Sequence, residues 1–245
     1  FCAAPSSPGK ANTCPTARPE RPMSLHRRHR LHGLYAITDP ALTPDERLLP
    51  AAEAALRGGA RLLQYRDKTA SPAQREYRAA QLRALCHQYS ALFIVNDDPA
   101  LAARVDADGV HIGQSDGGIK AAREQLGGSR IIGVTCHGDL ALAGQAAEAG
   151  ADYLAMGRFF TSQTKPQAPP ASLAVLRQAC QQFHQPVVAI GGVNPDNAPQ
   201  LIDAGAVSVA VIHALFGHAD TASIEAAARR FSACFPASAG QAIPE

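Results

Sequence analysis

The stretch Leu62-Leu63-Gln64-Tyr65-Arg66-Asp67-Lys68 decides the fold, because a short apolar run passes directly into polar and charged side chains. Similar apolar runs recur from residue 33 onward, separated by longer Ala- and Leu-rich stretches at helical spacing. Short strands that alternate with helices indicate βα units and a parallel sheet. We therefore predict eight strands, over residues 34–38, 62–66, 92–96, 109–112, 131–135, 153–156, 187–190 and 207–212.

Eight helices are predicted between and after these strands, over residues 46–57, 73–89, 100–105, 119–126, 140–149, 172–182, 197–204 and 223–231. Three of them end at Gly58-Gly59-Ala60, Gly150-Ala151 or Gly205-Ala206. A glycine after the last helical turn adopts the left-handed conformation without a Cβ clash, so these steps indicate helix stops. Pro72 and Pro195 are expected in first helical turns, where a missing N–H costs nothing.

Polar side chains follow nearly every predicted strand, and their distribution distinguishes two arrangements of eight parallel strands. In an open doubly wound sheet, only the strands at the switch point carry ligand-binding residues at their ends. In a closed barrel, all eight strand ends converge on one mouth, where barrel active sites lie. The sequence therefore predicts an α/β protein with a single (β/α)8 TIM barrel. The strand-end residues are Thr38, Asp39, Gln64, Arg66, Lys68, Asn96, Asp97, Gln114, Asp116, Thr135, His137, Thr164, Lys165, Gly191, Gly192 and His213.

The length of 245 residues fits one barrel, so no second domain is required. We predict a disordered, basic, Pro-rich tail over residues 1–30, a barrel catalytic domain over 31–235 and a flexible C-terminal tail over 236–245. Residues 1–30 hold six of the 23 Lys and Arg but only one of the 21 Asp and Glu, which leaves the remainder slightly negative. Nucleic-acid binding by the barrel is therefore not expected.

The chain shows no secretory or membrane signal. Residues 1–22 lack an apolar h-region, and Met23 is a candidate natural start; an organelle transit peptide is the alternative, opposed by the many prolines. No apolar run approaches the roughly 20 residues that span a bilayer. The six scattered cysteines form no CxxC pair, which indicates reduced thiols and a cytoplasmic location.

Three polar side chains of the opening stretch share one side of the chain. Side chains alternate along a strand, so Gln64, Arg66 and Lys68 point the same way. Arg offers a planar fork of donors and Lys a mobile charge, which together suit a polyanion such as diphosphate. The alternative is a solvated strand end with salt bridges.

A second group consists of carboxylates after the third and fourth predicted strands. Mg²⁺ prefers oxygen ligands and commonly binds through one or two carboxylates together with substrate phosphates. Asp97 and Asp116 can supply those carboxylates, beside Asn96. Asp98 is expected instead to favour the start of the following helix, and the same alternative applies to Asp97.

Two further segments suit phosphate. The long loop 158–170 contains Ser162-Gln163-Thr164-Lys165, and loops of this length are commonly lids or binding loops, although a plain connection is the alternative. Gly191-Gly192 follows the seventh strand, and Ile212-His213 follows the eighth. Barrels frequently bind a phosphate between these two loops, at the N-terminus of a short helix.

Taken together and in order, these motifs resemble the thiamine-phosphate synthase family. The resemblance covers about residues 31–216, and the stretches that carry it are Tyr35-Ala36-Ile37-Thr38-Asp39, Gln64-x-Arg66-x-Lys68, Asn96-Asp97-Asp98, Asp108-Gly109-Val110-His111-Ile112-Gly113-Gln114-x-Asp116, Ile132-Gly133-Val134-Thr135-x-His137, Thr164-Lys165 and Ile190-Gly191-Gly192. Each stretch alone is weak, whereas the ordered set is specific.

The resemblance implies roles for these residues. It assigns an aminopyrimidine diphosphate to Gln64, Arg66, Lys68, Asn96, Thr135 and Lys165, and we count Tyr65 and Asp67 among the substrate-binding residues of the same stretch. It assigns a thiazole phosphate to Ser162, Gln163, Thr164, Gly192, Ile212 and His213. It assigns one Mg²⁺ to Asp97 and Asp116, and catalysis to Arg66, Lys68, Thr135 and Lys165.

This chain departs from the family's usual motifs at two places. Where the family often has Thr-x-Thr-Lys, the chain has Ser162-Gln163-Thr164-Lys165, which keeps a hydroxyl. Where the family often has Ile-Ser after the last strand, the chain has Ile212-His213. A backbone amide can still serve at residue 213, so only the role of the His213 side chain stays open.

The implied reaction is Mg²⁺-dependent thiamine-phosphate synthesis, a transfer between small-molecule substrates without nucleic acid or membrane; homo-oligomerisation is left open. A related thiazole tautomerase is one alternative, but it needs no joint set of cations and carboxylates. A non-catalytic sensor of a phosphate ligand is another. A phosphosugar isomerase or decarboxylase is disfavoured, because no acid/base pair is evident.

Overall fold

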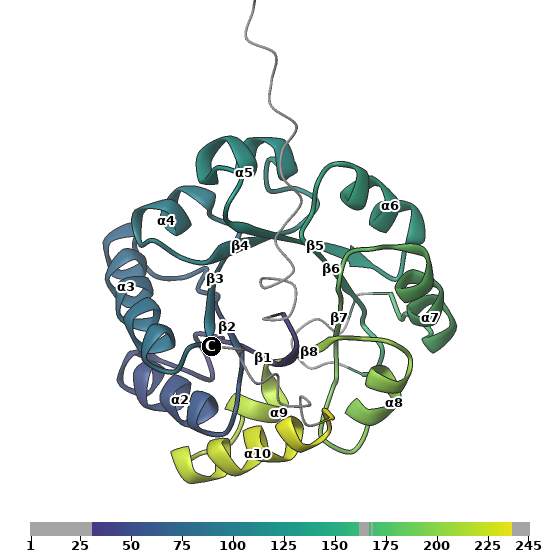
Figure 1. Ribbon diagram of the computed structural model, residues 1–245. Helices are drawn as coiled ribbons and strands as arrows, with labels where there is room; N and C mark the ends of the chain where they lie inside the picture. Colours follow the sequence, from purple (N-terminus) through teal and green to yellow (C-terminus); the bar gives the residue numbers. More distant parts are fainter. Residues whose placement is uncertain (1–30, 162–166, 168, 237–245) are drawn as a thin grey trace, which may run out of the picture.

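A closed barrel of eight parallel strands forms the centre of the molecule (Figure 1). The computed structural model describes residues 31–161, 167 and 169–236. Each strand pairs with the next, and β8 pairs with β1, so the predicted (β/α)8 barrel is confirmed. The strands are β1 Gly33–Ile37, β2 Leu62–Tyr65, β3 Leu92–Asn96, β4 Gly109–Ile112, β5 Ile131–His137, β6 Tyr153–Met156, β7 Val187–Ile190 and β8 Ser208–Val211.

Helices surround the barrel as an outer ring (Figure 1). The eight predicted helices are present, and α9, a single turn after β8, is an addition that the sequence analysis did not predict. Residues 1–30, 162–166, 168 and 237–245 lie outside the described residues, so the two predicted tails stay predictions. The helices are α2 Asp45–Arg57, α3 Pro72–Gln88, α4 Pro99–Arg104, α5 Gly118–Leu126, α6 Leu140–Glu148, α7 Leu173–Gln182, α8 Ala198–Asp203, α9 His213–Phe216 and α10 Thr221–Ala233.

The predicted glycine stops are confirmed. Gly59, Gly150 and Gly205 have φ angles of +101°, +90° and +105° directly after the last turns of α2, α6 and α8. In each case the next N–H turns back to a carbonyl of the helix, as in the bond from Ala60 N to Ala55 O.

The two prolines expected in first helical turns differ in outcome. Pro72 is the first residue of α3, as predicted, and Ser71 caps that helix. The prediction for Pro195 was wrong, because this residue lies in a turn before α8, which begins at Ala198. Asn194 and Asn197 form a hydrogen-bonded turn over these residues, so the helix begins only after Asn197.

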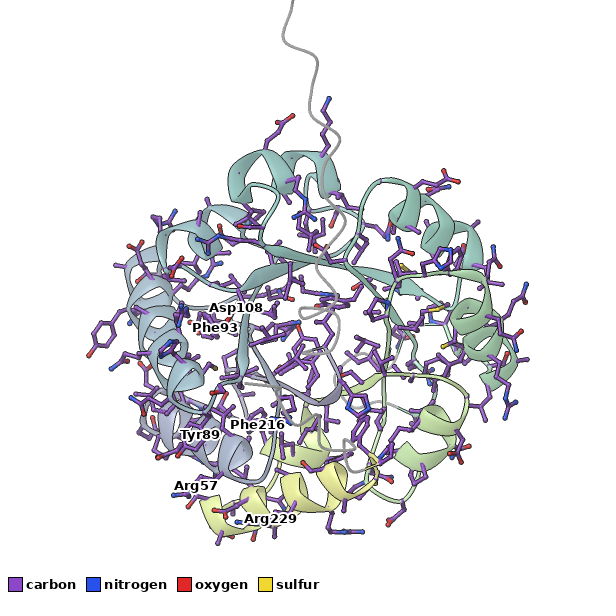
Figure 2. All side chains as sticks on the ribbon, viewed as in Figure 1. Arg57, Tyr89, Phe93, Asp108, Phe216 and Arg229 are labelled. Atoms are coloured by element: carbon purple, nitrogen blue, oxygen red, sulfur yellow. The ribbon has the colours of Figure 1, made fainter. Side chains whose placement is uncertain are left out.

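Because side chains alternate between the two faces of each strand, the buried residues form two separate cores. One set of buried side chains lies between the barrel and the helices, as Phe93 does on the helix side of β3 (Figure 2). The other set fills the barrel interior and includes two large polar residues, Tyr35 and Tyr153, both almost fully buried. Barrel interiors are usually filled by branched aliphatic side chains, so two buried phenols there point toward a function.

No helix among the described residues combines the length and the apolar character that crossing a membrane requires.

Candidate active site

A cavity of about 710 Å³ opens at the carboxyl ends of the barrel strands. All eight strands or the loops after them contribute to its lining. Ten of the predicted site residues line this one cavity: Gln64, Arg66, Lys68, Asn96, Asp97, Asp116, Thr135, Gly192, Ile212 and His213. The convergence expected of a closed barrel is therefore present. Ser162, Gln163, Thr164 and Lys165 lie outside the described residues.

The two predicted cations of β2 each face a carboxylate. Arg66 Nη1 lies 3.1 Å from Asp39 Oδ2, and Lys68 Nζ lies 2.9 Å from Asp97 Oδ2. The backbone N–H of Arg66 also donates to Thr38 Oγ1 at 2.9 Å. Contacts from β1 and β3 thus hold both cations at the mouth of the cavity, where an incoming anion can exchange for a carboxylate.

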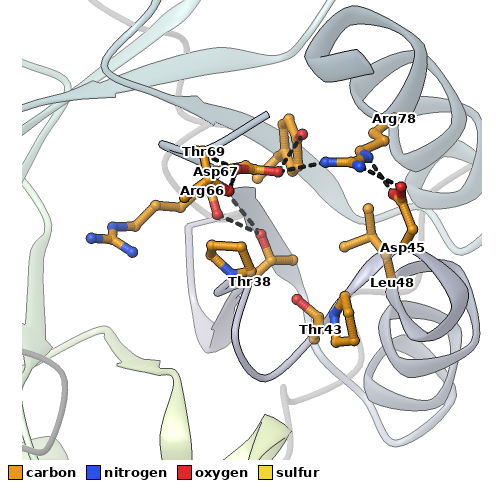
Figure 3. A pocket seen from close by; sticks show the side chains of 11 residues that line it. Thr38, Thr43, Asp45, Leu48, Arg66, Asp67, Thr69 and Arg78 are labelled. Carbon is orange, nitrogen blue, oxygen red and sulfur yellow. Dashed lines mark hydrogen bonds and ion pairs between the residues drawn. The ribbon is translucent and has the colours of Figure 1, made fainter. Parts of the chain in front are cut away.

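Tyr65 and Asp67 lie outside the mouth cavity, beside a smaller pocket of about 200 Å³ between β1, β2 and their helices (Figure 3). Asp67 Oδ2 accepts hydrogen bonds from Tyr65 Oη at 3.4 Å and from Arg78 Nη1 at 2.7 Å. In Figure 3 the Arg66 side chain points away from Asp67 and Arg78. Strand alternation explains the difference, because Tyr65 and Asp67 alternate with the three inward side chains.

The Asp67 carboxylate is held by local hydrogen bonds. Thr69 N and Ala70 N donate to its Oδ1 at 2.9 and 3.0 Å. Burial raises the pKa of Asp67, but these hydrogen bonds and the positive charge of Arg78 outweigh it, so the pKa lies below 3.8. Asp67 therefore connects the loop after β2 to Arg78 of α3.

The carboxylates predicted to bind metal come from two neighbouring strands and face the same cavity. Asp97 follows β3 with a left-handed φ of 63°, and Asp116 Oδ2 accepts a hydrogen bond from Gly113 N at 2.6 Å. The described residues include no group of three or more His, Cys, Asp or Glu side chains that could hold a metal ion. Two carboxylates at one cavity are donors that suit an ion such as Mg²⁺, which takes few protein ligands and completes its shell with phosphate and water.

Asp98 starts a helix, as predicted. Its Oδ1 accepts from Leu101 N at 2.8 Å and caps α4, while its Oδ2 pairs with Arg75 at 3.0 Å. These contacts turn the Asp98 side chain away from a role in the mouth cavity.

The glycine pair after β7 lies against the loop after β6. A Cβ atom on Gly192, which has a φ of +67°, would lie 2.3 Å from Thr161 O. The backbone of Phe160 donates to Gly191 O at 3.0 Å, which fixes this approach. On the other side, Ile212 precedes α9 and His213 begins it, which provides the short helix expected beside a barrel phosphate site.

A chain of hydrogen bonds that the sequence analysis missed crosses the floor of the cavity. Gln64 Nε2 donates to Tyr35 Oη at 2.8 Å, and Tyr35 Oη bonds Tyr153 Oη at 2.9 Å. Tyr153 Oη bonds His111 Nδ1 at 2.9 Å, and His111 Nε2 bonds Thr135 Oγ1 at 2.8 Å. Polar residues at inward positions of predicted strands were the signal that could have indicated it.

Similarity to known proteins identifies the family of this chain. Residues 34–215 match the model of a family described as thiamine monophosphate synthase. The chain belongs to this family. The thiamine-phosphate synthase of Alcanivorax borkumensis is 90% identical over 207 residues, which cover 84% of this chain and 95% of that protein. The enzyme of the same name from Saccharophagus degradans is 52% identical over 189 residues, covering 77% and 87%.

A solved structure shows the same architecture. The thiamine phosphate pyrophosphorylase of Pyrococcus furiosus is 36% identical, covers 85% of this chain and 96% of its own, and superposes with a TM-score of 0.77. As a member of the thiamine monophosphate synthase family at this level of identity, the chain is an enzyme of the transferase class.

Proposed function

We propose that this enzyme condenses 4-amino-2-methyl-5-(diphosphooxymethyl)pyrimidine with 4-methyl-5-(2-phosphooxyethyl)thiazole, or its carboxylated precursor, to give thiamine monophosphate and diphosphate. The observation that supports it best is that one cavity holds the cations Arg66 and Lys68, the carboxylates Asp97 and Asp116, and the glycine pair with α9. A substrate with a diphosphate at one end and a partner with a phosphate at the other suit these two anchor regions. The cavity volume of about 710 Å³ suits ligands of this size.

In the proposed reaction, the bond between the pyrimidine methylene carbon and the diphosphate oxygen breaks, and diphosphate keeps the electron pair. The lone pair of the thiazole nitrogen forms the new carbon–nitrogen bond. In this proposal the negative charge grows beside Arg66 and Lys68, which line the cavity, and Lys165 joins them by family resemblance. The nucleophile is a neutral ring nitrogen, so the step needs no general base.

A single Mg²⁺, when bound by Asp97 and Asp116, would offset charge on the diphosphate and orient it. Asp97 already contacts Lys68, so the same carboxylate can meet either a lysine or an ion. The chain's own residues supply alignment: Gln64, Asn96 and Thr135 line the cavity on the side of β2, β3 and β5.

The deciding experiment measures diphosphate release with each substrate alone, with both, and with both in the presence of a chelator. We expect release only when both substrates and Mg²⁺ are present. A thiazole tautomerase would convert the thiazole phosphate alone, and a sensor would bind ligand without releasing diphosphate. Either result would contradict the proposal.

We also propose a cytoplasmic location and small molecules as the enzyme's partners. Cys86, Cys136, Cys180 and Cys234 are free thiols, which supports a reducing compartment.

A further inference from the structure

The hydrogen-bond chain beneath the cavity joins side chains from five strands. Its members are Tyr35 on β1, Gln64 on β2, His111 on β4, Thr135 on β5 and Tyr153 on β6. Its two ends, Gln64 and Thr135, both line the cavity and are separated by two intervening strands. A change at one end can therefore reach the other end without passing through a ligand.

One direction of donation can run through the whole chain, starting from the Gln64 amide. Tyr35 Oη accepts the Gln64 amide N–H, so its own single proton is available to Tyr153 Oη. Tyr153 can then donate its proton to His111 Nδ1. Among the buried side-chain nitrogen and oxygen atoms of the described residues, only Arg75 Nε lacks a partner, so neither phenol is left unsatisfied. Burial raises the pKa of both phenols, which keeps them protonated.

The same direction continues through the imidazole. In the tautomer that continues this direction, His111 Nδ1 accepts from Tyr153, and Nε2 carries the ring proton and donates it to Thr135 Oγ1. The Thr135 hydroxyl can then donate its own proton into the cavity. At the opposite end, Gln64 uses Nε2 within the chain and presents its Oε1 acceptor.

We propose that Tyr35, Tyr153 and His111 are positioning residues, which make Gln64 an acceptor and Thr135 a donor toward the pyrimidine ring. This inference rests on the proposed function, which supplies that ring. An aminopyrimidine has amino N–H donors and ring-nitrogen acceptors at separate positions of its edge, so it needs one acceptor and one donor from the protein. Reversing the direction of the chain would present a donor to the amino group and an acceptor to the ring nitrogen.

The first test replaces Tyr153 with Phe, which keeps the ring and breaks the chain at its middle. We expect the KM for the pyrimidine diphosphate to rise roughly tenfold, the effect of about one hydrogen bond, while the KM for the thiazole phosphate changes less than about twofold. The matched control is Tyr89→Phe. Its hydroxyl donates to Glu53 at 3.0 Å, away from the cavity, so neither KM should change.

A second test measures coupling between the two ends. Gln64→Leu and Thr135→Val, alone and together, should affect the KM for the pyrimidine diphosphate non-additively in the parent enzyme. In the Tyr153→Phe background the two effects should become additive, because the connection is broken. If Tyr153→Phe does not fold, His111→Leu removes both ring nitrogens, breaks the chain at the next residue and serves in its place.

The outcomes separate the two proposals. A parent enzyme that releases no diphosphate overturns the proposed function, and this inference with it. An active parent in which Tyr153→Phe behaves like Tyr89→Phe, or raises both KM values equally, overturns the positioning role alone. Non-additivity between Gln64→Leu and Thr135→Val that persists in the Tyr153→Phe background also overturns the positioning role alone.

Discussion

Lys68 Nζ and Asp97 Oδ2 lie 2.9 Å apart at the mouth of the barrel, so a predicted diphosphate-binding cation contacts a predicted metal ligand. The Lys68 side chain is 61% exposed. A pair in such a position contributes only about 0–1 kcal/mol to the free energy of unfolding. Little is therefore lost when the two groups separate, and under the proposed function a magnesium diphosphate would take the place of each partner.

Replacing Asp97 with Asn tests this exchange. Asn tolerates the left-handed backbone at this position, so the fold should persist, whereas magnesium affinity should fall with the lost charge. We expect turnover to drop by about 10²-fold, since the ion offsets charge that develops as diphosphate leaves. Steady-state kinetics over a magnesium titration and a thermal unfolding curve provide the measurement.

Asp98→Asn is the matched control for that variant. Asn also caps helices well, so α4 should keep its cap and lose only the charge that faces Arg75. Turnover and magnesium dependence should stay near those of the parent. If Asp98→Asn were the impaired variant and Asp97→Asn the normal one, the metal would belong to the other carboxylate.

Gly192→Ala should impair the thiazole phosphate more than the pyrimidine diphosphate. The added Cβ would lie 2.3 Å from Thr161 O, so the loop after β6 must move. We expect a larger rise in the KM for the thiazole phosphate, measured with each substrate varied in turn. Gly150→Ala is the control, because its φ of +90° also lies where residues other than glycine are rare, but no atom lies within 4 Å of the new Cβ. It should cost about 1–2 kcal/mol of stability and leave both KM values unchanged.

Asp67→Asn should lower stability rather than substrate affinity. The pKa of Asp67 in the folded protein lies below 3.8, so the unfolded chain binds the proton more readily. The carboxylate therefore stabilises the fold at neutral pH, and this contribution disappears as the pH falls through 3.8 and below. Urea unfolding between pH 7 and pH 3 should show the difference between parent and variant shrinking at the acid end. If Asp67→Asn raised the KM for a substrate and left stability normal, Asp67 would instead be a substrate-binding residue.

Cys86 and Cys136 should resist alkylation while the protein is folded. Burial raises the pKa of each thiol to about 12, helped by Asp108 and Asp139 respectively. At pH 8 almost no thiolate is present to react. Peptide mapping after iodoacetamide treatment should find both unmodified until a denaturant is added, and labelling of either in the native protein would contradict this burial.

The barrel was predictable because several independent signals agreed at each unit. Around Gly150, a helical stretch, a glycine stop and an apolar run follow one another, and each of them alone would have been ambiguous. Helix α9 was missed because a single turn, from His213 to Phe216, is too short to show a helical period.

The strand-end residues of the site were predictable from several strands, and the side that each residue faces was clearest where one strand carried the whole motif. Gln64, Arg66 and Lys68 lie together because strand alternation requires it, and the same rule places Tyr65 outside the mouth cavity. The contact between Tyr35 and Tyr153 joins residues 118 positions apart in the sequence. Alternation shows that each faces inward, but which inward side chains meet depends on the stagger of the strands, and a single sequence does not encode that in any local pattern.

The pairing of β8 with β1 has a consequence for how the protein is made. Hydrogen bonds such as Gly33 N to Val207 O join the first and last strands of the barrel. Until the ribosome has released β8, the nascent chain carries two unpaired strand edges, one on β1 and one on β7. Such edges can pair with other chains, so aggregation during synthesis is a hazard that ends only when the last strand closes the ring.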